Sequence, residues 1–200
     1  MLKRTTLWIR NRLVRRQVCR GKAVDIWSTG RYPANVLSNL CDNEFVFDGV
    51  QCGSMEGFLQ SLKTEDEDYQ LQICRMGGRA AKKEAEDVRL FSWRKRQTVY
   101  WKGKAMHRQS EEFALLVREA YKAMFEQNQC FREALLSTKG KRLYHSRGED
   151  DPTKTILTEK EFCEILTELR KREVLEGDTD DSTRELTEKY MAMCRSQAGI

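Results

Sequence analysis

Residues 44–63 read EFVFDGVQCGSMEGFLQSLK, and this stretch predicts a strand, a turn and a helix in immediate succession. Phe45 and Phe47 share one face of the strand, and Asp48-Gly49 is a strong turn signal. Ser54 is a suitable N-cap for the helix that follows. The apolar stripe of that helix is formed by Met55, Phe58, Leu59 and Leu62.

The same helix carries three chemically useful side chains along one edge. Glu56, Gln60 and Lys63 follow one another at intervals of four and three residues, so they lie within about 60° of one another around the helix axis. The apolar stripe is centred roughly 110° away. A carboxylate, an amide and an amine therefore line one edge of a half-buried helix. The spacing alone equally fits a solvated face with one weak ion pair.

Capping signals and apolar periodicity predict the remaining elements. Helices are expected at about Asp68 to Lys83, from the cap Ser110 to about Phe125, at Phe131 to Leu136, after the capping box Thr158/Glu161, and after the capping box Ser182/Glu185 to about Cys194. Leu143-Tyr144-His145 is expected to be a short strand. The pattern predicts an α+β fold, a helix-rich single domain with a few short strands.

Positive charge is concentrated at the N-terminus. Residues 1–24 contain eight Lys or Arg and no acid, whereas the rest of the 200-residue chain has 28 bases and 31 acids. We therefore divide the chain into a basic N-terminal arm (1–24), a folded domain (25–175) and an acidic linker with a terminal helix (176–200). The arm could form a strand, a basic helix or a partly disordered tail. It could pack against the domain, contact nucleic-acid phosphates or lie on a membrane surface.

Cysteine usage and hydropathy bear on compartment and cofactors. The seven cysteines are scattered, with no CxxC pair and no histidine cluster, which argues against a disulfide framework or a zinc site. No apolar run approaches the roughly 20 residues that a membrane span needs. The longest apolar stretch of the arm, Leu7-Trp8-Ile9, is too short for a secretory signal. We expect a cytoplasmic protein with no membrane contact, metal or cofactor.

Several other segments offer polar or aromatic side chains to a site. The candidate side chains are Ser38, Asn39, Arg79, Trp101, His145, Ser146, Asp150 and Asp151. Loops between regular elements often carry function, and a Gly-Gly pair such as the one before Arg79 can admit a phosphate. Ordinary alternatives are local hydrogen bonds in a loop, a solvated turn, a break in a helix and a core tryptophan.

In order and spacing, these motifs resemble the NADAR family of YbiA-like proteins. That family has an sNf segment, a strand and turn, and an E-h-x-x-Q-x-x-K helix, which 37–40, 45–49 and 54–63 match here. The similarity continues through 78–82, Trp101, 124–128, 135–140, 143–146 and 162–170, and covers about residues 32–171. There are two departures. Gly57 replaces a histidine or tyrosine-type residue, and Pro152-Thr153 replaces a common Trp-Gly.

The resemblance implies hydrolysis of an N-glycosidic bond. It implies that Glu56 is the acidic catalytic residue and that Lys63 attacks the anomeric carbon. Trp101 and either Asp150 or Asp151 match further site positions. Other NADAR members look like hydrolases that remove ADP-ribose from guanine, and the basic arm favours such a nucleic-acid substrate here. The alternative is a phosphorylated riboflavin-pathway intermediate, the substrate class linked to YbiA-like members.

The chemistry of the residues agrees with that expectation. Cleavage between ribose C1 and nitrogen passes through an oxocarbenium-like state that a carboxylate stabilises, and a desolvated amine can form a Schiff base at C1. We expect Gln60 to hold sugar hydroxyls, Trp101 to stack on a base, and Asn39, Arg79 and His145 to contact phosphate or sugar. Two other classes stay open. One is a non-catalytic module that reads ADP-ribose or a nucleotide, and the other is a structural partner acting through residues 176–200.

Overall fold

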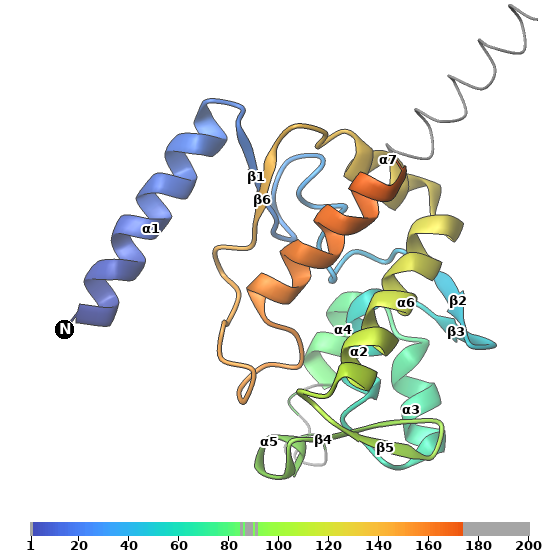
Figure 1. Cartoon of the computed structure of the whole chain (residues 1–200). Helices are drawn as coiled ribbons and strands as arrows, with labels where there is room; N and C mark the ends of the chain where they lie inside the picture. Colours follow the sequence, from blue (N-terminus) through green and yellow to red (C-terminus); the bar gives the residue numbers. More distant parts are fainter. Residues whose placement is uncertain (1, 85, 87–89, 91, 174–200) are drawn as a thin grey trace, which may run out of the picture.

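The computed structural model describes residues 2–84, 86, 90 and 92–173 (Figure 1). The helices are α1 Leu2–Cys19, α2 Met55–Ser61, α3 Glu67–Cys74, α4 Gly78–Glu84, α5 Ser92–Arg96, α6 Glu111–Gln127 and α7 Gln129–Leu136, with a further helical segment at residues 159–173. The strands are β1 Ala23–Asp25, β2 Phe45–Phe47, β3 Val50–Cys52, β4 Thr98–Trp101, β5 Lys104–His107 and β6 Arg142–Tyr144. The predicted α+β class, rich in helix with a few short strands, is confirmed.

The described strands form three separate pairs. β1 and β6 are parallel, with Val24 opposite Leu143, and they join two segments that are far apart in the sequence. β2 and β3 form the hairpin signalled by Asp48-Gly49, whose φ angles of 48° and 76° are typical of a tight hairpin turn. The sequence predicted the first strand and the turn, but not the return strand. β4 and β5 form a second hairpin, which was not predicted.

One main hydrophobic core makes this a single domain. α2 lies at its centre, packed against α3 and α4, and all seven of its residues are buried. Phe58 of α2, Tyr121 of α6, Phe131 of α7 and Phe162 of the 159–173 helix belong to the same cluster. The polar edge of α2 is therefore held in place by packing on its other sides.

Several helix starts were predicted correctly from capping residues. The Ser110 hydroxyl accepts a hydrogen bond from the Phe113 backbone N–H at 3.1 Å and opens α6. Thr158 and Glu161 form the predicted reciprocal capping box, with bonds of 2.8 Å and 3.2 Å between side chain and backbone. The helix that this box opens supplies Phe162 to the core.

The single helix predicted at about 68–83 is wrong, because the chain breaks into α3 and α4. A Cβ atom on Gly78 would lie 2.5 Å from the Leu40 Cα atom, and its backbone N–H donates to Asp42 Oδ1 at 2.7 Å. The Gly-Gly pair thus lets the start of α4 pack directly against the 38–42 backbone.

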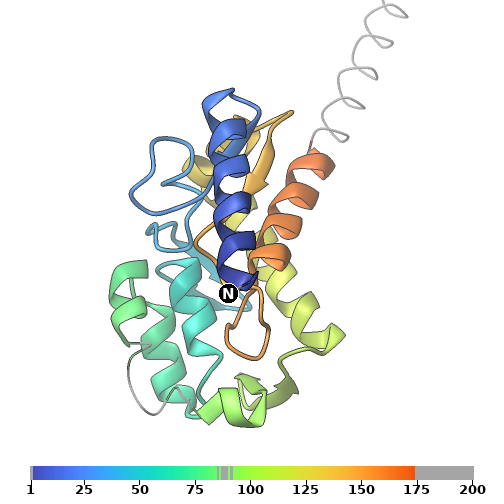
Figure 2. The same cartoon turned by 90° about the vertical axis from the view of Figure 1, so that its left-hand side faces the viewer.

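The basic arm is helical in the structure and lies against the domain (Figures 1 and 2). Val14 is buried there, Arg10 pairs with Glu159, and Gln17 accepts a hydrogen bond from the Tyr144 hydroxyl. The boundary between residues 24 and 25 falls inside β1. Within the described residues, no helix is long and apolar enough to cross a membrane. The acidic linker and terminal helix predicted at 176–200 lie outside the described residues.

Candidate functional site

The N-terminal turn of α2 fixes the first residue of the site. Ser54 caps the helix by accepting from the Gly57 N–H at 2.9 Å and donating to the Met76 carbonyl at 3.0 Å. The Glu56 backbone N–H donates to the Asn39 carbonyl at 3.0 Å. These bonds attach the start of α2 to the segments that contain Asn39 and Met76. The backbone position from which the Glu56 side chain extends is therefore fixed.

Glu56, Gln60 and Lys63 form one continuous hydrogen-bonded chain. The Gln60 Nε2 donates to Glu56 Oε1 at 2.8 Å, and the Lys63 ammonium donates to Gln60 Oε1. A Gln60 amide in this orientation satisfies both neighbours, since it accepts from the amine and donates to the carboxylate. The helix ends at Ser61, and Lys63 continues the row from the following turn. All three side chains are buried, as their residues are at most 8% exposed.

The environment of Lys63 favours the neutral form of its amine more than water does. Burial lowers the pKa of the Lys63 amine to about 8, aided by the positive charges of Lys82 and Arg94 and opposed by the Glu56 carboxylate. The amine also lies 5.5 Å from the ring centroid of the buried Trp93. A lysine with this pKa is partly deprotonated near neutral pH and can act as a nucleophile.

A cavity of about 260 Å³ opens beside this chain of side chains. Its lining comes from α2, from Asn39, from α4 and α5, and from the loop that precedes the 159–173 helix. The charged side chains among its lining residues are Glu56, Lys63, Lys82, Arg94, Arg147, Glu149 and Lys154. Five cations and two carboxylates make the cavity electropositive, which suits a phosphorylated ligand.

Asn39 and His145 are two further predicted candidates that line the cavity. Asn39 Oδ1 accepts a hydrogen bond from the buried Tyr121 hydroxyl at 2.7 Å, an arrangement that leaves the amide NH₂ for another acceptor. Burial raises the pKa of Tyr121 well above its usual value, so this hydroxyl stays a donor. The His145 Nδ1 is 2.7 Å from the Ile26 carbonyl, and its ring stands edge-on to Phe162.

Other predicted candidates lie outside the lining of the cavity. Trp101 is a core residue, with its indole N–H donating to Asp48 and its ring packed against Phe47 and Phe58. Ser38 is buried beneath the 38–42 turn, where its hydroxyl accepts from the Leu40 N–H. Arg79 is exposed on α4.

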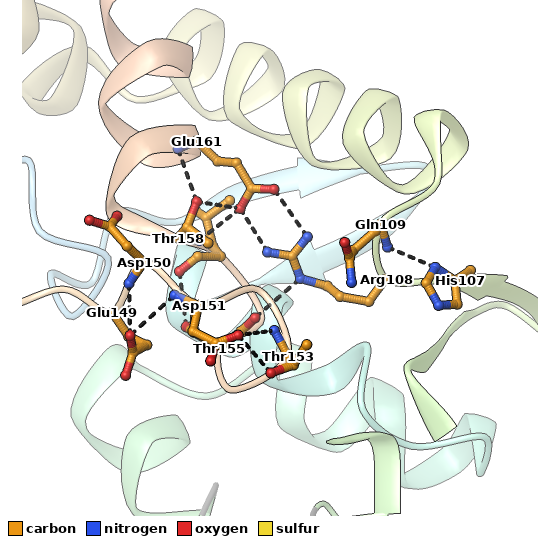
Figure 3. A network of polar contacts seen from close by, with 11 residues as sticks. His107, Arg108, Gln109, Glu149, Asp150, Asp151, Thr153, Thr155, Thr158 and Glu161 are labelled. Atoms are coloured by element: carbon orange, nitrogen blue, oxygen red, sulfur yellow. Dashed lines mark hydrogen bonds and ion pairs between the residues drawn. The ribbon is translucent and has the colours of Figure 1, made fainter. Parts of the chain in front are cut away.

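The loop at residues 146–155 lines the cavity with Arg147, Gly148, Glu149, Lys154 and Thr155 rather than with its two aspartates. Ser146 is held by Asp25 through two bonds, at 2.8 Å and 2.6 Å. Asp151 caps its own loop through Thr153 and Lys154, and these bonds lower its pKa to about 2. Asp150 lies near Arg10 of α1, at 3.7 Å. Figure 3 shows these aspartates within the network of polar contacts of the loop, and neither lines the cavity.

A buried arginine braces the loop that forms one wall of the cavity (Figure 3). The Arg108 guanidinium forms a bidentate salt bridge with the Glu161 carboxylate, with hydrogen bonds of 2.7 Å and 3.1 Å. It also donates a hydrogen bond to the Thr155 carbonyl at 3.2 Å. Arg108 is 1% exposed, and its guanidinium lies over the Phe113 ring. The brace therefore fixes the position of the wall relative to the helical core.

The sequence did not single out several cavity residues. They are Lys82, Arg94, Glu149, Arg147 and Lys154. Lys82 lies 3.6 Å from the Glu56 carboxylate, and Arg147 stacks over the Trp27 ring at 4.2 Å. Lys82 lies in a segment that was predicted to be helical, but the sequence did not show which element this helix would contact. Its position beside Glu56 could have been found only by knowing how α4 packs on α2. Within the described residues, no group of three or more His, Cys, Asp or Glu side chains is placed to hold a metal ion.

Most of the chain matches a family of bacteriophage proteins. The sequence model of the family described as Bacteriophage protein GP30.3 matches residues 31–171, and the chain belongs to this family. One relative is the uncharacterized 17.1 kDa protein in the Gp30–rIII intergenic region of Enterobacteria phage T4. It is 38% identical over 151 residues, which is 74% of this chain and 96% of the relative.

Among solved structures, the NMR structure of the E. coli protein YbiA is similar to this one. The two superpose with a TM-score of 0.54 at 20% sequence identity, over 78% of this chain and 87% of YbiA. The fold is therefore YbiA-like, as the sequence resemblance implied. α1 precedes the residues that the family model matches.

Proposed function

We propose that this protein hydrolyses an N-glycosidic bond in a nucleotide-type substrate. The observation that carries the proposal is a buried lysine amine, linked through Gln60 to a buried carboxylate, on the wall of an electropositive cavity. The favoured substrate is ADP-ribose attached to guanine in nucleic acid.

In the first step, the neutral Lys63 amine forms a bond to ribose C1 as the bond from C1 to the base nitrogen breaks. The base nitrogen keeps the electron pair, and the adjacent carboxylate stabilises the positive charge that develops on the sugar. Glu56 accepts the proton that the attacking amine loses and delivers it to the base. Gln60 holds the amine and the carboxylate in register, since it bonds to both.

In the second step, ring opening converts the adduct to a Schiff base at C1. Water adds to C1, the bond to the Lys63 nitrogen breaks, and the free amine is regenerated. The net reaction adds one water and releases the base and the sugar. Lys82, Arg94, Arg147 and Lys154 surround the same cavity and would pair with the phosphates of the sugar nucleotide.

Product analysis tests the proposal. We expect wild-type protein incubated with an ADP-ribosylated guanine oligonucleotide to release ADP-ribose, detected by mass spectrometry, and Glu56→Gln to release far less. The same assay with a phosphorylated aminopyrimidine riboside tests the alternative substrate of the riboflavin pathway. A cavity of about 260 Å³ lies just below the roughly 300–1,000 Å³ of typical ligand sites, so we expect it to take the ribosyl end of either compound rather than the whole molecule.

Borohydride trapping tests the covalent step. Wild-type protein with substrate should give a stable adduct whose mass and peptide map place it on Lys63, and Lys63→Ala should give none. Lys83→Ala is the matched control, because Lys83 is an exposed lysine of α4 that does not line the cavity. An adduct that persists in Lys63→Ala would overturn the assigned nucleophile. Binding without turnover of either substrate would instead favour a nucleotide-reading module.

A further inference from the structure

The outward face of α1 combines arginines with an exposed tryptophan. Arg12, Arg15 and Arg16 are exposed on this helix, and Trp8 is 60% exposed. The Arg12 guanidinium lies 5.4 Å from the centre of the Trp8 ring. Residues 1–24 carry no acid to neutralise this charge. Arginines that pair with phosphates beside an aromatic plane that can stack on bases are typical of nucleic-acid-binding surfaces.

The middle of α1 contacts residues that are next in sequence to the cavity lining. Arg10 pairs with Glu159 and lies 3.7 Å from Asp150. Asp150 directly follows Glu149, and Glu159 directly follows Thr158, both of which line the cavity. A chain lying along α1 would therefore pass near the loop segments that border the cavity.

The other end of α1 leads to a second basic surface. The Lys22 carbonyl accepts from the Arg142 N–H at 3.0 Å, so the segment after α1 adjoins the start of β6. There a groove of about 680 Å³ lies between residues 139–143 and the 159–173 helix. Its lining cations are Lys139, Lys141, Arg142, Arg170 and Lys171, and none of its lining residues is acidic. The segment after α1 thus adjoins a residue of this basic groove.

The distribution of apolar residues on α1 favours a polyanion over a membrane. Among the side chains of α1 that the structure describes, which are those of residue 8 and residues 10–19, the large exposed apolar ones are Trp8, Leu13 and Val18, five residues apart. That spacing separates each from the next by about 140° around the helix, so they do not form one apolar face. A helix that lies on a bilayer needs such a face to insert.

We propose that α1 and the groove at residues 139–143 form a docking surface for a nucleic acid strand, which brings a modified base to the cavity. The docking surface is inferred from contacts and charges alone and does not depend on the proposed function. Only the delivery of a base for cleavage rests on the proposed function.

Binding to unmodified DNA tests the docking surface without any need for turnover. We expect fluorescence anisotropy with a labelled strand and a labelled duplex of about 20 nucleotides to show binding by the full chain. Arg12→Gln/Arg15→Gln/Arg16→Gln should bind about tenfold or more weakly, and the slope of log affinity against log salt should become shallower by about 2 to 3. Lys139→Gln/Lys141→Gln should also weaken binding and reduce the slope.

A control variant matches the change in charge on another face. Lys104→Gln/Arg118→Gln/Lys122→Gln also removes three surface cations, from β5 and α6, each paired with a glutamate, and should change affinity by less than about twofold. Equal losses in both triple variants, or none in the α1 variant, would overturn the proposal. So would α1-dependent binding to phosphatidylserine vesicles without binding to DNA. If no substrate is turned over, the proposed function fails, and the binding result still decides the role of α1.

Discussion

The buried position of Lys63 destabilises the charged form of its amine. Its residue is 8% exposed, and burial lowers the pKa of its amine from 10.5 to about 8 although Glu56 is nearby. A lowered lysine pKa means that the folded state disfavours the charged form. The protein therefore keeps at this position a residue that lowers its stability at neutral pH, which is typical of a functional site.

We predict that Lys63→Met stabilises the protein at pH 7 by roughly 1–3 kcal/mol. Below pH 8, Lys63 is charged in both states, so the wild type carries the full desolvation cost. Between about pH 8 and 10.5, the folded state has lost the proton and the unfolded state has not, so the wild type regains stability as pH rises. The gain from the substitution should shrink across this window, measured by urea unfolding at pH 7 and pH 10.

Lys82→Met provides the comparison for that experiment. The Lys82 side chain is 65% exposed and lies in the same cavity, so its removal should change stability by less than about 0.5 kcal/mol at both pH values. A destabilised Lys63→Met at pH 7, or a stability difference that does not vary with pH, would show that the Lys63 amine is not disfavoured by burial.

Gln60→Glu should move the pH dependence of activity. The new carboxylate would take the place of the amide oxygen that now accepts from Lys63, and a negative charge there raises the pKa of the amine. We expect the acidic limb of kcat/KM to shift upward by about one pH unit or more, with an approximately tenfold loss at pH 7. Arg79→Gln, which alters an exposed residue outside the cavity lining, should leave the profile unchanged.

At the scale of residues, helical spacing predicted correctly which side chains of one helix lie together. The position of a residue along the chain said little about its contacts with distant segments. Glu56, Gln60 and Lys63 could be placed together because their spacing depends on one local period. For Trp101 the sequence left a base-stacking role and a place in the core both open, because its neighbours Phe47 and Phe58 come from distant segments. The same holds for Lys82, which reaches Glu56 only through the packing of α4 on α2.

At the scale of elements, α2 depends on a close approach to the end of α3. A Cβ atom on Gly57 would lie 2.8 Å, 2.9 Å and 3.0 Å from the carbonyl oxygens of Met76, Cys74 and Ile73. This contact gives a physical reason for glycine at position 57. The backbone of α3 occupies the space that a side chain would need.

We predict that Gly57→Ala destabilises the protein by about 2 kcal/mol or more, measured by thermal or urea unfolding. In an open helix the same change would stabilise by about 1 kcal/mol, so the sign of the effect reports the contact. Gly49→Ala is a useful comparison. Gly49 has open space around its Cβ position but a φ of +76°, so its substitution should cost only about 1 kcal/mol of backbone strain. A neutral or stabilising Gly57→Ala would mean that α2 and α3 lie farther apart.

The wall opposite α2 depends on Arg108. Arg108→Met would leave Glu161 without its two-pronged partner and the Thr155 carbonyl without a donor. We expect a loss of about 2–4 kcal/mol in the free energy of unfolding. Adding Glu161→Gln to Arg108→Met should recover part of that loss, because an amide is less costly than an unpaired carboxylate. Additive effects of the two substitutions in a double-mutant cycle would argue against the ion pair as the brace.

The elements found from the sequence are those with local signals. α6 and the 159–173 helix are opened by side chains that bond within one turn, so their starts could be read directly. The break before α4 depends on a contact with Leu40, which is far away in the sequence and leaves little trace in any single window. The β4–β5 hairpin is local, and its turn at Lys102-Gly103 has the same φ angles, 48° and 76°, as the turn at Asp48-Gly49, so a short-range signal was present there and was missed.

At the scale of the whole molecule, charge and fold are divided between two parts of the chain. The basic helix α1 lies before the family's matched region, which begins at residue 31, while the remainder of the chain after residue 24 is slightly acidic. The cavity is nevertheless electropositive, because its cations converge from α4, α5 and the loop at residues 147–154. α1 is therefore an addition that extends positive charge beyond the cavity without taking part in its walls.

This division predicts that salt affects long and short substrates differently. If the proposed reaction occurs, kcat/KM on an ADP-ribosylated oligonucleotide should fall steeply between about 50 and 200 mM salt, because released counterions drive the binding of phosphates to α1. On a single ADP-ribosylated nucleotide, which is too short to reach α1, the fall should be much smaller. Arg12→Gln/Arg15→Gln/Arg16→Gln/Arg20→Gln should make the two salt dependences similar while leaving turnover of the nucleotide unchanged. Equal salt dependence for both substrates with the wild type would show that α1 does not contribute to binding the longer one.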